Sequence, residues 1–111
     1  MVKCCVFLFV VFVSFNVFAR SLVCSAYVNL EFKFSNQVDS NLNEKISIGR
    51  EPNFRAYVTQ KENDIFIVEA FIVNQEVRVY GEGTLKSDTD RIKASIWSRE
   101  EIIDIDCVLA H

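Results

Sequence analysis

The sequence predicts an all-β domain of antiparallel strands that is closed by one disulfide bond. Two observations carry this prediction: apolar and polar residues alternate with a period of two along most of the chain, and one cysteine lies near each end of the alternating region. The 111 residues provide for one small domain, and a composition of 50% hydrophobic residues is too apolar for a disordered chain.

Residues 1–19 have the pattern of a secretory signal peptide. Lys3 supplies a basic start, an unbroken apolar segment runs from Cys4 to Val13, and Ala19 is the small residue at the expected cleavage point. The apolar segment is shorter than the roughly 20 residues that span a membrane, so an uncleaved anchor is the alternative rather than the prediction. We therefore expect a single β-domain at residues 20–111, secreted or periplasmic, with no membrane contact after cleavage.

Cys24 and Cys107 are the two cysteines that remain after cleavage. In an oxidising compartment they are expected to form a disulfide bond, which joins the first strand to the last. The closed loop is long, so the chain-entropy estimate of its stabilisation is about 4 kcal/mol. Two free thiols or a metal site are the alternatives, but the only histidine is His111 and two thiolates make an incomplete metal site. We expect neither a metal nor a cofactor.

The alternation predicts the elements in chain order. Residues 24–34 carry apolar side chains at the even positions and predict the first strand, whereas the polar segment 35–44 predicts a loop. Ile46 and Ile48 indicate a short strand, which is followed by a turn or bulge at residues 49–53. Further strands are expected at residues 54–60, 64–73, 76–86, 91–98 and 101–109. The predicted meander has seven strands, or six if residues 46–60 form one bulged strand. If the first and last strands are antiparallel neighbours, the number of strands must be even.

Four hairpin loops give a proposed register. They place Gln60 opposite Asp64, Val73 opposite Glu76, Lys86 opposite Arg91 and Ser98 opposite Glu101. One face of the sheet then holds only apolar residues and glycine, in the rows Val58, Phe66, Gly83, Ala94, Ile105 and Ala56, Val68, Gly81, Ile96, Ile103. Because glycine inside a strand is typical of a bent sheet, the pattern predicts a small barrel or a strongly coiled sheet, with a two-sheet sandwich as the alternative.

The opposite face of the proposed sheet gathers aromatic, apolar and basic side chains. These candidate binding residues are Tyr57, Ile67, Phe71, Arg78, Tyr80 and Trp97. Aromatic residues and arginine are enriched in protein-binding patches, although cross-strand aromatic pairs also stabilise a sheet without a partner, by roughly 0.2–1 kcal/mol each. Glu69 is placed between Arg55 and Tyr80, where we expect a surface ion pair.

The acidic residues offer no catalytic arrangement. Asp104 and Asp106 share a strand face, but Lys93 lies opposite Asp106 in the proposed register and an ion pair accounts for the acid. The segment 88–90 lacks the glycine and terminal glutamate of a calcium loop and predicts a polar turn. The sequence contains no P-loop, GxSxG, HExxH or CxxC motif, so we do not expect an enzyme.

The sequence favours an exported binding protein that acts on an unidentified protein or glycan through its aromatic sheet face. An inhibitor of a secreted hydrolase, acting through the loops 35–44 or 87–90, is the alternative, and a carrier of a small apolar ligand is the third possibility. The net charge of −3, without a run of lysine or arginine, gives no electrostatic basis for binding nucleic acid. Neither the partner nor the oligomeric state follows from the sequence.

Overall fold

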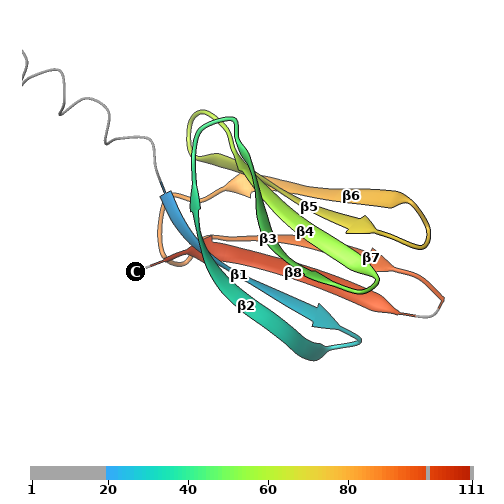
Figure 1. The fold of residues 1–111 in the computed structure, drawn as a ribbon. Helices are drawn as coiled ribbons and strands as arrows, with labels where there is room; N and C mark the ends of the chain where they lie inside the picture. Colours follow the sequence, from blue (N-terminus) through green and yellow to red (C-terminus); the bar gives the residue numbers. More distant parts are fainter. Residues whose placement is uncertain (1–19, 100, 111) are drawn as a thin grey trace, which may run out of the picture.

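The protein is a sandwich of two antiparallel sheets (Figure 1). The computed structural model describes residues 20–99 and 101–110, and within them it contains eight strands. The strands are β1 (Arg20–Val28), β2 (Glu31–Ser40), β3 (Lys45–Glu51), β4 (Phe54–Gln60), β5 (Ile65–Ile72), β6 (Val77–Thr84), β7 (Arg91–Trp97) and β8 (Ile102–Leu109). The terminal sheet has the order β2-β1-β8-β7, and the middle sheet has the order β3-β4-β5-β6.

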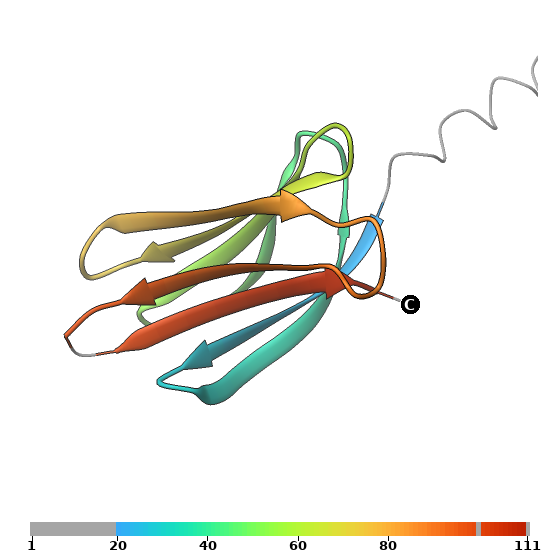
Figure 2. The ribbon, with the colours of Figure 1, turned by 180° about the vertical axis from the view of Figure 1, so that it is seen from behind.

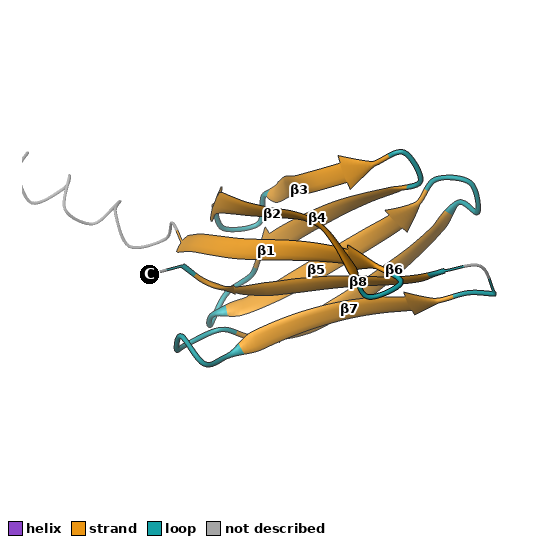
Figure 3. Ribbon diagram, turned by 90° about the horizontal axis from the view of Figure 1, so that it is seen from below, coloured by secondary structure: helices purple, strands orange, loops and turns teal. Residues whose placement is uncertain are grey.

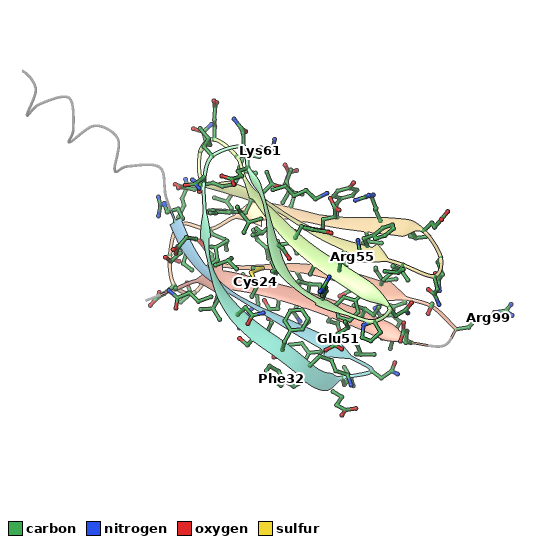
Figure 4. All side chains as sticks on the ribbon, viewed as in Figure 1. Cys24, Phe32, Glu51, Arg55, Lys61 and Arg99 are labelled. Atoms are coloured by element: carbon green, nitrogen blue, oxygen red, sulfur yellow. A yellow bond between two sulfur atoms is a disulfide. The ribbon has the colours of Figure 1, made fainter. Side chains whose placement is uncertain are left out.

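The predicted all-β class and the disulfide between the first and last strands are confirmed. Cys24 of β1 lies directly opposite Cys107 of β8, with Cα atoms 4.1 Å apart and an S–S bond of 2.08 Å. Both cysteines are fully buried between the sheets, and Cys24 is labelled there in Figure 4. The two sheets correspond to the sandwich alternative, and the expected signal peptide at residues 1–19 lies outside the described residues.

The predicted strand count of six or seven is wrong because the first strand is in fact a hairpin. The chain turns at Asn29 and Leu30, both of which have positive φ angles, 52° and 68°. The predicted loop at residues 35–44 is also wrong, since β2 continues to Ser40 and pairs with β1 along its length. Residues 46–60 form β3 and β4 as separate strands on either side of the turn at Pro52 and Asn53.

A bulge in β2 changes which phenylalanine faces the core. Ala26 pairs with Phe34 and Tyr27 pairs with Phe32, so Lys33 is the extra residue. Phe34 therefore turns inward and stacks on Phe54, whereas Phe32 turns outward and is 58% exposed. The prediction that both phenylalanines lie on the buried face is wrong for Phe32.

The remaining pairings retain the predicted faces. The β5–β6 and β7–β8 registers are confirmed. The loop between β4 and β5 begins one residue later than predicted, so Gln60 lies opposite Phe66 instead of Asp64. A shift of two residues leaves every side chain on the same face, because side chains alternate with a period of two. The predicted pairing of Lys86 with Arg91 is wrong, since β6 and β7 belong to different sheets.

Gly81 lets the two sheets approach closely where β6 passes β7 (Figure 2). A Cβ atom at Gly81 would lie 2.2 Å from the carbonyl oxygen of Lys93, and one at Gly83 would lie 3.0 Å from Cγ1 of Ile92. The glycines therefore make room for the neighbouring strand β7. No helix among residues 20–99 and 101–110 has the length and hydropathy needed to cross a membrane.

Candidate functional site

The six predicted binding residues do not form one patch. Five of them, namely Tyr57, Ile67, Phe71, Arg78 and Tyr80, lie on the outer face of the middle sheet. Trp97 lies on the outer face of the terminal sheet, because the chain changes sheets between β6 and β7. The prediction that all six residues share one face of a single sheet is therefore wrong, and the two outer faces are described separately.

On the middle sheet, the chain's own cations cover two of the aromatic rings. The carboxylate of Glu69, which is 7% exposed, accepts a hydrogen bond of 2.6 Å from Arg78 and lies 3.0 Å from Lys45 Nζ. Lys45 Nζ lies 4.6 Å above the ring of Tyr57, and the guanidinium carbon of Arg78 lies 4.7 Å above Phe71. Both rings thus have an intramolecular partner for a face that a ligand would otherwise use.

Glu69 differs from the expected surface ion pair in its position and in its burial. It lies between Tyr57 and Tyr80, not between Arg55 and Tyr80, because of the two-residue shift in the β4–β5 register. Its carboxylate is buried beneath two half-exposed cations, whereas Tyr80 remains 59% exposed. Ionised Glu69 therefore holds the cations down on the aromatic rings.

The terminal sheet instead leaves its aromatic and apolar side chains exposed. The β1–β2 and β7–β8 turns lie at the same end of this sheet (Figure 3). There Leu30 is 81% exposed, Trp97 is 77% exposed and Phe32 is 58% exposed. Tyr27 packs its ring edge-to-face against Phe32, with 5.9 Å between the ring centroids. We call Tyr27, Leu30, Phe32 and Trp97 the aromatic end. Ile102 joins its two halves, because it pairs with Trp97 and exchanges hydrogen bonds with Asn29 beside Leu30.

A groove runs from the aromatic end along β8. It has a volume of about 300 Å³ and is lined by Tyr27, Leu30, Arg91, Lys93, Asp104 and Asp106. Asp104 and Asp106 project from β8, with Tyr27 of β1 opposite Asp104 and Lys93 of β7 opposite Asp106. The groove therefore has carboxylates on its central strand, an apolar wall on one side and cations on the other.

The two carboxylates of the groove differ in their hydrogen bonding. Asp104 accepts a hydrogen bond from Ser95, whereas Oδ1 of Asp106 has no hydrogen-bond partner among the described residues. Burial raises the pKa of Asp106, while Arg91, whose Nε lies 3.3 Å from Oδ1, and Lys93 act in the opposite direction. The ion pair expected with Lys93 is made with Arg91 instead. Oδ1 of Asp106 is thus held by an ion pair with Arg91 and makes no hydrogen bond within the described part of the chain.

Sequence reasoning missed most of the aromatic end. The turn at Asn29 and Leu30 interrupts neither the alternation nor the apolar pattern, so residues 24–34 read as one strand. The available signal was length, because eleven alternating residues exceed the usual strand of five or six. The asparagine was the second signal, since asparagine is several-fold enriched at positive φ.

No family model matches the sequence, no curated protein matches it, and no solved structure matches it. Among the described side chains, no group of three or more histidines, cysteines, aspartates or glutamates is placed to hold a metal ion.

Proposed function

We propose that the protein is an exported binding protein that holds a saccharide in the groove of the terminal sheet, against the aromatic end. Export is supported by the signal-like pattern of residues 1–19 and by the Cys24–Cys107 disulfide, since such bonds persist in oxidising compartments. This proposal moves the binding face from the middle sheet, where cations cover the rings of Tyr57 and Phe71, to the terminal sheet, where Leu30, Phe32 and Trp97 are exposed.

The charges of the groove favour a neutral, polyhydroxylated ligand. Arg91 and Lys93 balance Asp104 and Asp106, so the lining offers hydrogen-bond donors and acceptors without a net charge. A small anion or cation would meet a like charge beside its partner, whereas sugar hydroxyls can both donate and accept. The ring of Tyr27 supplies an apolar wall, and a volume of about 300 Å³ lies at the lower end of small-molecule sites.

One observation carries the proposal: Leu30 combines exposure with backbone strain. Its φ of 68° lies in the left-handed region, which is costly for a bulky residue and suits glycine or asparagine. Its side chain is 81% exposed and lines the groove. Leu30 thus destabilises the turn by about 1–2 kcal/mol relative to glycine, and its side chain adds an apolar surface to the groove. A costly residue at such a position is expected where the strain serves binding.

The test relies on one substitution that should raise stability and lower saccharide affinity. In Leu30→Gly, we expect the free energy of unfolding to rise by about 1 kcal/mol, because strain is relieved. We expect saccharide binding to weaken at least fivefold, because the apolar wall is lost. The probes are neutral mono- and disaccharides, screened by saturation-transfer NMR against the disulfide-bonded protein. Tyr27→Ala should also weaken binding, whereas Tyr80→Ala, the control on the other sheet, should not.

Two results would contradict the proposal. One is the absence of binding by the unmodified protein across the saccharide panel. The other is binding that Leu30→Gly and Tyr27→Ala leave unchanged. If the aromatic end instead captures a protein, then Phe32→Ala and Trp97→Ala should abolish a pull-down that saccharides do not compete, and the saccharide assignment is wrong.

The other two functions have weaker support. The hydrolase-inhibitor hypothesis loses most of its first loop, because β2 takes up residues 35–40 and leaves residues 41–44 between β2 and β3. The carrier hypothesis needs interior space, but the inward faces are filled by a core of large side chains. This core includes Leu22, Phe54, Phe66, Ile72, Leu85, Ile103 and Ile105.

A further inference from the structure

Two arginines lie opposite each other on the middle sheet, beside the turn that joins β3 to β4. Arg50 of β3 pairs directly with Arg55 of β4, and both side chains are exposed. They line a second pocket, of about 390 Å³, together with Glu51, Pro52 and Val73. Figure 4 labels Arg55 on β4 and Glu51 beside the β3–β4 turn.

The charges of this arginine pair are not compensated. Like charges directly opposite each other destabilise an antiparallel pair, whose Cβ atoms lie about 4.5–5.5 Å apart. Within the described part of the chain, no carboxylate oxygen lies within 4.0 Å of either guanidinium, although Arg20, Arg78 and Arg91 each have such a partner.

Glu51 lines the same pocket without forming an ion pair within this distance. Its carboxylate reduces the positive charge of the lining from two to one without neutralising it. An arriving dianion therefore still meets a net attraction, and it can take hydrogen bonds from both guanidinium groups.

We propose that the Arg50–Arg55 pocket binds a tetrahedral dianionic group, a sulfate or a phosphate. Each guanidinium presents parallel N–H donors in a planar fork that matches two oxygens of such a group. A dianion matches the two guanidinium charges and removes the cross-strand repulsion, which a neutral ligand cannot do. The group can come from a free inorganic anion or from an ester on a larger molecule. The pocket lies on the opposite sheet from the groove, so this inference does not depend on the saccharide proposal.

The experiment compares thermal unfolding in sodium sulfate and in sodium chloride at equal, low ionic strength. In chloride, Arg55→Gln should unfold at a temperature about 1–5 °C higher than the unmodified protein, because the repulsion is relieved. Sulfate should stabilise the unmodified protein saturably, shifting its unfolding equilibrium about elevenfold at ten times the dissociation constant. Arg55→Gln and Arg50→Gln should lose this saturable gain. Arg99→Gln, which changes an arginine that Figure 4 shows projecting from the β7–β8 turn, is the matched control and should keep it.

Equal sulfate stabilisation of the unmodified protein and Arg55→Gln would overturn the proposal, since it would reflect the general effect of sulfate on proteins. NMR titration gives a second readout that does not depend on stability. The amides of Arg50 and Arg55 should shift saturably with sulfate, and unchanged amides would also overturn the proposal. Glucose 6-sulfate and glucose 6-phosphate then distinguish the sources: tighter binding than the inorganic anions indicates an ester group, and equal binding indicates a free anion.

Discussion

The close approach of β6 to β7 at Gly81 can be tested by adding one methyl group to β6. The Cβ of Gly81→Ala would lie 2.2 Å from the carbonyl oxygen of Lys93, more than an ångström short of ordinary contact. The obstacle is backbone, so no side-chain rotation relieves it and β6 must move away from β7. Overpacking typically costs 1–3 kcal/mol, and this contact belongs at the upper end, about 3 kcal/mol. For a domain of this size, the midpoint of thermal unfolding should fall by about 12 °C or more.

Gly83→Ala is the matched control, two residues further along the same face. Its Cβ would lie 3.0 Å from Cγ1 of Ile92, a side-chain atom that can yield by a few tenths of an ångström. Neither glycine has a positive φ angle, so alanine fits both backbones and reduces the entropy of the unfolded chain. We expect Gly83→Ala to change the free energy of unfolding by less than about 1 kcal/mol in either direction.

The assay is equilibrium unfolding in urea without reductant, followed by circular dichroism and by the fluorescence of Trp97. The two variants should share the slope of the transition with the unmodified protein and differ in the midpoint. If Gly81→Ala and Gly83→Ala are equally stable within about 1 kcal/mol, then β6 and β7 do not approach as closely as described. In that case the reasoning about the closure of the sandwich fails.

Two further predictions concern the disulfide and the groove. Replacing Cys24 and Cys107 by serine opens a loop with a sequence separation of 83. From the loop-closure entropy we expect the free energy of unfolding to fall by about 4.5 kcal/mol. An unchanged urea midpoint would contradict this. Burial raises the pKa of Asp106 in the folded protein above the ordinary 3.8, so the stability that its protonated form contributes is lost as the pH rises from 3.8 through the raised pKa. Asp106→Asn should remove this part of the decline when the free energy of unfolding is measured from pH 3 to pH 7, and a parallel decline in the variant would refute the assignment.

The sequence was sufficient to predict the strands and turns that depend on local residue patterns. Strands β4, β7 and β8 alternate between buried and more exposed residues, because one face of each meets the core and the other meets water. Asn63, in the turn between β4 and β5, has a φ of 62°, a conformation in which asparagine is enriched. Even the wrong β4–β5 register kept Phe66 and Val68 in the core, because an error of two residues does not exchange the faces.

The sequence could not predict the elements that tertiary contacts decide. Strand β2 lies at the edge of the terminal sheet and exposes most of its residues. Of its apolar side chains only Phe34 and Val38 pack against the core, so residues 35–40 show little apolar alternation. The change of sheet between β6 and β7 left no local sign, since the polar turn at residues 87–90 suits a hairpin equally well. Gly81 was interpreted as the sign of a bent sheet, whereas in the structure it makes room for the backbone at Lys93. The predicted face depends on the second of these features, and its six residues are therefore divided between the two sheets.

The two outer faces differ in how their aromatic side chains are covered, and this difference supports the proposed site on the terminal sheet. On the middle sheet, Tyr57 and Phe71 lie under cations that buried Glu69 holds in place, an arrangement that stabilises the free protein. On the terminal sheet, Leu30 and Trp97 are each more than three-quarters exposed and lose the free energy that burial would return, about 25 cal/mol for each Å² of apolar surface. A ligand that covers the aromatic end would recover this free energy, whereas a ligand that stacks on Tyr57 or Phe71 must first displace a cation that already has a partner. The strained backbone of Leu30 supports the same proposal, since replacing Leu30 by glycine would relieve the strain but remove part of the groove's apolar wall.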